Sequence, residues 1–116
     1  MKKIIITGAM LLAAGCFLMT GCGGDAPKQT KNEIHVVTHA NWNPFEYMEN
    51  GKIVGFDVDL AREAVKRAGL TMDLTDAGWE ALFEQIRSHQ ADMAISGVTI
   101  TKDREASYLF SVPYFL

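Results

Sequence analysis

The sequence predicts an α/β domain with a parallel-type sheet flanked by helices, because strand-like and helix-like segments alternate along it. Three short segments, 34–38, 70–75 and 92–96, are rich in β-branched residues or alternate apolar with polar side chains, as strands do. The segments between them, 57–68 and 79–88, place apolar residues at the spacing of a buried helix face. The order strand, helix, strand, helix, strand is typical of a parallel sheet.

A loop and a hairpin are expected after the first strand. Pro44 restricts the residue before it and interrupts the extended chain, which predicts the loop. The dipeptide Asn50-Gly51 is a strong turn signal, and it predicts a hairpin between residues 45–48 and 52–54.

The helix predicted over 57–68 carries charges that suit its dipole. Asp57 and Asp59 lie in its first turn, basic residues lie in its last turn, and Gly69 can end it. Two residues apart on a helix, the two carboxylates do not face each other as a catalytic or metal-binding pair would. We therefore interpret them as charge compensation at the start of the helix.

The second helix and the segments after it complete the predicted domain. Leu82, Phe83 and Ile86 form the buried face of this helix. After the third strand we expect a loop, a brief helix over 102–107 and a final strand near 108–112.

The N-terminal region has the features of a secretory signal peptide. Two lysines precede an uncharged, mostly apolar run over 4–20, which is on the short side for the alternative, a membrane anchor helix. The sequence Met-Thr-Gly-Cys that ends at Cys22 resembles the lipobox of bacterial lipoproteins, in which the cysteine is acylated, for example with palmitate. Cys16 is a competing site, but apolar residues follow it, whereas flexible polar residues follow Cys22. We expect a lipoprotein signal peptide over 1–21 and a flexible tether over 22–32.

The composition of the mature chain argues against several kinds of partner. Removal of residues 1–21 leaves nine basic and fourteen acidic side chains, a net charge of −5, so nucleic acid is not an expected partner. Cys16 would leave with the signal peptide and Cys22 would be acylated, so no cysteine would remain for a disulfide or a thiolate metal site. His35, His39 and His89 lack metal-ligand spacing, and neither a metal nor another cofactor is expected. The 84 residues of 33–116 are enough for one small domain.

Five motifs are spread over this predicted domain. One of them is Gly-Phe-Asp-Val-Asp-Leu at 55–60, which alone is moderately specific. The others are the Trp-Asn-Pro-Phe-Glu loop at 42–46, the helix start at 78–82, the loop and helix start at 96–104, and the closing stretch at 110–115. In their order and spacing they resemble family 3 of the bacterial extracellular solute-binding proteins, the receptors of polar amino-acid importers.

This resemblance implies a fold and a function. Members fold as two α/β lobes, of the periplasmic-binding-protein type II kind, that close over a ligand. The chain would supply the first lobe, 33–116, truncated before the second lobe, so we expect a fragment that binds its ligand weakly. It would be the extracytoplasmic amino-acid receptor of an ABC importer, exported, lipid-anchored at the cell membrane and not an enzyme. Its partners would be permease and ATPase subunits.

Two alternatives share this fold by the same resemblance. One is the substrate domain of a periplasmic dehydratase or lytic transglycosylase, although no activated nucleophile or acid/base pair is evident in 33–116. The other is the sensory module of a signalling kinase, against which the lipid-anchored start argues.

The segment 96–99 is predicted to cradle the ligand. It follows the third strand at the carboxyl edge of the sheet, where open α/β folds bind ligands. Gly97 permits close backbone approach, and N–H groups before the short helix, capped by Thr101, can face an anion. The resemblance implies that Gly97 and Thr99 bind backbone groups of the ligand, with Ser96 in the same cradle.

Arg104 lies in the first turn of the short helix, where a positive charge is electrostatically disfavoured. That position is explained if the guanidinium binds a carboxylate with its two-pronged geometry. The alternative is a surface arginine paired with Asp103 or Glu105. The resemblance implies that Arg104 binds the α-carboxylate of the ligand.

Trp42 and Trp79 are either core residues or walls of the ligand site. The resemblance implies that aromatic rings at these two positions sandwich the ligand's side chain, in an apolar slot with a few polar groups. His39 stands where many members that bind cationic or amide side chains have an acidic residue, which puts a basic ligand in doubt.

Overall fold

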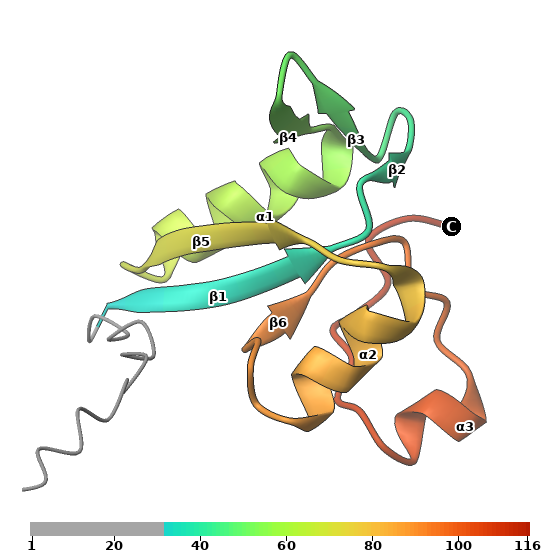
Figure 1. Cartoon of the computed structure of the whole chain (residues 1–116). Coiled ribbons are helices and arrows are strands. Elements are labelled where there is room, and N and C mark those ends of the chain that lie inside the picture. Colours follow the sequence, from blue (N-terminus) through green and yellow to red (C-terminus); the bar gives the residue numbers. More distant parts are fainter. Residues whose placement is uncertain (1–31) are drawn as a thin grey trace, which may run out of the picture.

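The computed structural model describes residues 32–116, which form a three-stranded parallel sheet with a helix on each face (Figure 1). The strands are β1 (Glu33–Thr38), β5 (Thr71–Asp76) and β6 (Met93–Ala94), and β1 lies in the middle. β1 pairs with β5 from Glu33↔Thr71 to Thr38↔Asp76 and with β6 at Val36↔Met93. The predicted α/β fold with a parallel sheet is confirmed.

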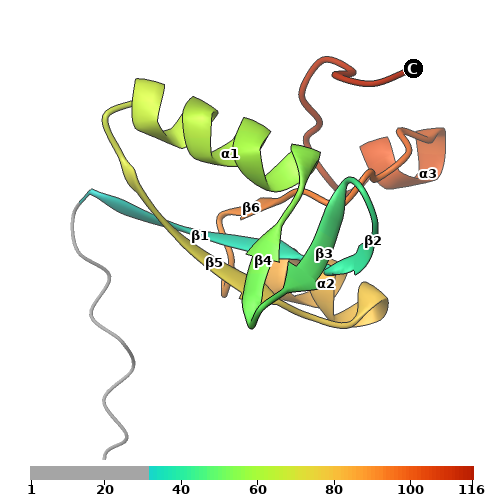
Figure 2. The same ribbon diagram turned by 90° about the horizontal axis from the view of Figure 1, so that it is seen from above.

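Successive residues of β1 pack against opposite helices. These helices are α1 (Phe56–Arg67) and α2 (Trp79–Arg87). Val36 packs with Ala61 of α1, whereas Val37 packs with Leu82 of α2, and both valines are completely buried. Figure 2 shows the two helices on opposite sides of the sheet. Side chains that alternate along the strand thus build two small cores.

A second, antiparallel sheet lies beside the carboxyl end of β1. Its strands are β2 (Asn41–Trp42), β3 (Glu46–Glu49) and β4 (Lys52–Val54). β3 and β4 form the hairpin that Asn50-Gly51 predicts. The segment 41–45 is not only a loop, because Trp42 pairs with Glu46 across β2 and β3. This pairing holds Trp42 beside the end of the main sheet.

The N-terminus of α1 is fixed to the turn that precedes β3. The N–H of Phe56 donates to the carbonyl of Pro44 (3.0 Å). The N–H of Asp57 donates to the carbonyl of Phe45 (2.9 Å). A Cβ at Gly55, whose φ is 128°, would lie 2.2 Å from the Phe45 oxygen, so this approach requires glycine. The contact carries Asp57 into the interior, where its side chain is fully buried.

The chain after β6 departs from the prediction. β6 is shorter than the strand expected over 92–96, and α3 (Lys102–Glu105) is shorter than the helix expected over 102–107. The strand predicted near 108–112 was wrong. Its apolar side chains suit a strand, but a strand also needs a neighbour for its backbone N–H and C=O groups. None of the described strands pairs with this segment.

The N-terminal predictions fall on residues outside the described part of the chain. These are the signal peptide over 1–21, all but the last residue of the tether over 22–32, and the lipidation sites Cys22 and Cys16. Within residues 32–116, none of the helices has the length and apolar character that crossing a membrane requires.

Candidate functional site

The predicted cradle follows β6 at the carboxyl edge of the main sheet. Ser96 is buried, and Gly97 has a φ of 53°. The indole of Trp42 covers Gly97, and a Cβ at this position would lie 2.3 Å from Cζ3 of that ring. Trp42 and the cradle, which are far apart in sequence, are therefore in contact.

Ser96 is held by two parts of the chain at once. Its hydroxyl donates to Oε1 of Glu46 (2.8 Å) and accepts from the backbone N–H of His39 (3.2 Å). The hydroxyl therefore ties the cradle to β3 and to the chain that leaves β1. A direct contact between Ser96 and a ligand stays a prediction.

Gly97 is held by a carboxylate. Its N–H donates to Oδ2 of Asp57 (2.9 Å), and the Tyr114 hydroxyl donates to the same oxygen (2.8 Å). Asp59 pairs with Arg62 at the surface, as a helix-start charge would. Asp57 is different, because its fully buried side chain supports the cradle from behind.

Glu46 and Asp57 are the site residues that sequence reasoning missed. Glu46 is 1% exposed and Asp57 is 0% exposed. Burial raises the pKa of Glu46 from 4.5 to about 7, the charge of Asp57 and a hydrogen bond to it also raise it, and the Ser96 hydrogen bond and His39 lower it. Burial, followed by the hydrogen bond to Asp57, raises the pKa of Tyr114. The only available signal was that both acids lie in the recognised motifs.

Arg104 points back toward the cradle. Thr101 caps α3 as expected, since its Oγ1 accepts from the Arg104 N–H (3.3 Å). Nη1 of Arg104 donates to the carbonyl of Thr99 (2.9 Å). Among the described residues, Arg104 forms no ion pair with Asp103 or Glu105, which argues against the surface-pair alternative.

Two rings flank the guanidinium of Arg104. Its central carbon lies 5.6 Å from the ring centroid of Trp79 and 5.3 Å from that of Phe83. These two rings meet edge to face, with centroids 5.1 Å apart. The sequence identified Phe83 only as a core residue, whereas here it connects Arg104 to the cavity described next.

A cavity of about 900 Å³ opens beside the cradle. Its lining includes four predicted site residues, Trp42, Ser96, Gly97 and Thr99. Phe83 also lines it, whereas Trp79 and Arg104 do not and lie behind Phe83. The structure thus brings four of the six predicted residues to one hollow and groups the other two next to it.

Most of this cavity is apolar. Away from the cradle, its walls are side chains of α1 and α2, such as Leu60 and Ile86, together with residues 108–115. The cavity runs along β6, which is an edge strand of the described sheet. The predicted polar site residues Ser96, Gly97 and Thr99 lie at the cradle end of the cavity.

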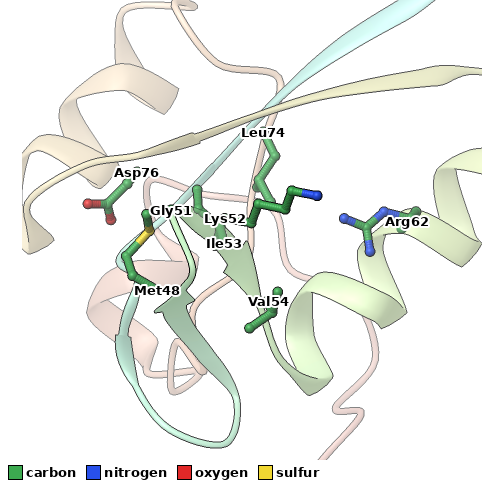
Figure 3. Close-up of a pocket in the computed structure, with 8 residues that line it drawn as sticks. All are labelled: Met48, Gly51, Lys52, Ile53, Val54, Arg62, Leu74 and Asp76. Carbon is green, nitrogen blue, oxygen red and sulfur yellow. The ribbon is translucent and has the colours of Figure 1, made fainter.

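Figure 3 shows a second hollow, of about 700 Å³, between the β3–β4 hairpin, α1 and β5. Lys52 and Arg62 line it, and the Arg62 guanidinium is paired with Asp59 at 3.1 Å. None of the predicted site residues lines this hollow. We therefore place the candidate site at the cradle.

One group of side chains has the composition of metal ligands. Glu33, His35 and Asp73 hold ligand atoms within 4.8 Å of one another at the amino ends of β1 and β5. Nδ1 of His35 lies 2.8 Å from Oδ2 of Asp73. Histidine spacing alone did not reveal this group, because its members come from two strands. The contact between His35 and Asp73 explains why these two side chains lie together.

Comparison with known proteins finds relatives that span most of the described residues. The family model of the bacterial extracellular solute-binding proteins, family 3, matches residues 34–116. The chain is similar to the arginine-binding extracellular protein ArtP of Bacillus subtilis (strain 168), with 36% identity over 119 residues. The match covers 99% of this chain and 45% of ArtP, so the chain spans less than half of that relative.

Solved structures give the same picture. The arginine-, lysine-, histidine-binding protein ArtJ from Geobacillus stearothermophilus is 53% identical, with a TM-score of 0.70 over 72% of this chain and 36% of its own. The arginine-bound form of domain 1 from TmArgBP is 41% identical, with a TM-score of 0.69 over 72% of this chain and 68% of its own. An ancestral cyclohexadienyl dehydratase is 30% identical, with a TM-score of 0.68 over 72% and 35%.

Proposed function

The chain belongs to family 3 of the bacterial extracellular solute-binding proteins, and we propose from this that it captures a cationic amino acid for an ABC importer. Its fold is that of a type II periplasmic binding protein, of which residues 33–116 cover part. An amino acid presents a carboxylate, an ammonium group and a side chain, and a receptor needs a partner for each.

One observation carries the proposal, namely the position of Arg104 beside the cradle. Its Nη1 bonds to the Thr99 carbonyl, which fixes the guanidinium at the cradle's edge. A guanidinium has five N–H donors, so further donors remain available to a ligand carboxylate. Trp42, Phe83 and the apolar cavity provide a slot for the side chain.

Two observations support a cationic ligand. ArtP is named as an arginine-binding protein, and ArtJ as one that binds arginine, lysine and histidine. Aromatic rings such as Trp42 can bind a cationic side chain through their faces. His39 still stands where many members that bind cationic side chains have an acidic residue, and its Nδ1 lies 2.8 Å from the Ala77 carbonyl.

A calorimetric titration tests the proposal. The full chain would be titrated separately with arginine, lysine and histidine. Glutamine, glutamate and leucine, which carry no positive charge on the side chain, would serve as comparison ligands. We expect arginine to bind at least tenfold more tightly than glutamine or leucine. Equal affinity for leucine, or no binding of any cationic amino acid, would overturn the proposed ligand class.

Similarity to a dehydratase makes an enzyme the second candidate. Burial raises the pKa of Glu46 to about 7, which would suit a general acid or base. However, it is 1% exposed and covered by Ser96, so it does not reach a substrate in the cavity. This favours a binding protein, and an assay for dehydration of a cyclohexadienyl substrate discriminates the two.

The cellular context is also proposed. Export and lipid attachment at Cys22 would hold the protein outside the cytoplasmic membrane, next to permease and ATPase partners. More than half of ArtP has no counterpart in the matched region. We propose that this part of such relatives supplies the second lobe, which closes the site. The arginine-bound domain 1 supports some binding by a single lobe.

A further inference from the structure

We propose that Glu46 and Asp57 share one proton in a buried hydrogen bond between their carboxyl groups, and that this proton fastens the cradle. Each acid uses one oxygen on the cradle, since Ser96 donates to Oε1 of Glu46 and Gly97 donates to Oδ2 of Asp57. The cradle's role as a ligand site rests on the proposed function, whereas the shared proton does not.

The remaining oxygens of the two acids explain why a proton is needed. Oε2 of Glu46 and Oδ1 of Asp57 are buried, and neither has a hydrogen-bond partner among the described residues. An unsatisfied buried oxygen is costly, and two buried carboxylates side by side repel each other. A proton held between these two oxygens would let Glu46 donate to Asp57 and would remove both costs, which agrees with Asp57 raising the pKa of Glu46.

The surroundings place the proton on Glu46. Asp57 accepts two hydrogen bonds at Oδ2, from Gly97 and from Tyr114, and it lies in the first turn of α1. Both features stabilise a carboxylate. Within residues 32–116, Ser96 donates a hydrogen bond to the Glu46 carboxyl. Of the charged groups near Glu46, His39 favours its ionised form and Asp57 opposes it.

The shared proton joins segments that are distant in sequence. Glu46 belongs to β3, Asp57 to α1, and Ser96 and Gly97 follow β6. When Glu46 loses its proton, two buried negative charges face each other behind the cradle. The cradle should then loosen as the pH rises through about 7, the pKa of Glu46.

The direct test is a carbon-13 NMR titration of the Glu46 side-chain carboxyl in the full chain without ligand. We expect a midpoint near 7 in the wild type. In Asp57→Asn the new amide can donate to Glu46, so the midpoint should fall by at least one pH unit. A wild-type midpoint near the ordinary value of 4.5, or an unchanged midpoint in Asp57→Asn, would overturn the proposal.

A second variant, Glu46→Gln, keeps the shape of the side chain but removes its ability to gain or lose a proton. In Glu46→Gln the amide can accept from Ser96 and donate to Asp57 without titrating. We expect the urea concentration at the unfolding midpoint to decrease in the wild type as the pH is raised from 5 to 8. In Glu46→Gln this midpoint should stay constant over the same pH range. Glu49→Gln, an exposed acid on the same strand, should follow the wild type. A slope in Glu46→Gln equal to that of the wild type would refute the shared proton.

Ligand binding gives an independent readout. Arginine affinity should weaken severalfold between pH 6 and pH 8 in the wild type and stay constant in Glu46→Gln. If arginine does not bind at any pH while Glu46 titrates near 7, the proposed ligand class fails and the proton pair stands. If arginine binds while Glu46 titrates near 4.5, the proton pair fails and the proposed function stands.

Discussion

The indole of Trp42 lies directly on the backbone of Gly97. A Cβ at Gly97 would meet Cζ3 of the indole at 2.3 Å and Cε3 at 3.0 Å, and the φ of 53° is one that other residues rarely adopt. Trp42 is held by β2 and is half exposed. One wall of the candidate site therefore depends on a residue without a side chain.

Gly97→Ala should displace Trp42 and weaken binding. The left-handed backbone alone costs a residue with a Cβ about 1–2 kcal/mol, so the free energy of unfolding should fall by about that amount. Arginine affinity should fall more than tenfold, because the indole must move off the cradle. Urea unfolding and calorimetry measure the two effects. Gly78→Ala, at a site with open space around it, is the control, and unchanged affinity in Gly97→Ala would contradict the assignment.

Arg104→Ala should remove the guanidinium that binds the carboxylate of the ligand. Loss of one member of a buried charge pair costs about 2–5 kcal/mol of binding free energy. Calorimetry with arginine measures this loss. Arg67→Ala, which breaks only an exposed pair with Glu63, should leave the affinity unchanged. A loss of less than tenfold in Arg104→Ala would count against the assigned role.

Ser96→Ala should change how stability depends on pH. The Ser96 hydrogen bond lowers the Glu46 pKa, so its loss should raise that pKa beyond about 7. Because the folded pKa lies above 4.5, the contribution of Glu46 is complete below about 4.5 and is lost as the pH rises through the folded pKa. Urea unfolding from pH 4 to pH 9 should place this loss at higher pH in Ser96→Ala than in the wild type. Loss of the hydrogen bonds should also lower stability by about 1–3 kcal/mol. If Ser96→Ala lost this stability at a lower pH than the wild type, the result would contradict the Ser96–Glu46 contact.

Gly55→Ala should unfold much of the chain. Its Cβ would lie 2.2 Å from the Phe45 carbonyl oxygen, and neither backbone can yield without breaking the start of α1. We expect a loss of about 4 kcal/mol or more, measured by urea unfolding. Gly69→Ala also places a side chain at a positive φ, but in open space, and should cost only about 1–2 kcal/mol. Equal losses of stability in the two variants would contradict the predicted clash between residue 55 and the Phe45 carbonyl.

Cys22→Ser should abolish incorporation of labelled palmitate, because a serine hydroxyl does not replace the thiol in the lipobox. The measurement is fluorography of cells fed labelled palmitate. Cys16→Ser, within the predicted signal peptide, should still be labelled and serves as the matched control. Label that is lost in Cys16→Ser but kept in Cys22→Ser would move the site to Cys16.

Local patterns predicted most of the elements. The β-branched run of β1, the turn dipeptide Asn50-Gly51 and the apolar spacing of α1 and α2 each specify a structure through nearby residues. The strand near 108–112 was wrong because pairing depends on a neighbouring strand, which a local pattern does not contain. β2 was missed because its two residues are too few to show the alternation of apolar and polar side chains that predicts a strand.

The sequence by itself indicated the family through the resemblance of its motifs, determined most of the elements through local periodicity, and predicted where the cradle lies in the chain. Only the tertiary structure decided what lies behind the cradle. Asp57 reads in the sequence as a helix-start charge, yet folding buries it against Glu46, Gly97 and Tyr114. The physical reason is that burial and charge proximity depend on segments that meet only after folding, and these two quantities control where a proton resides.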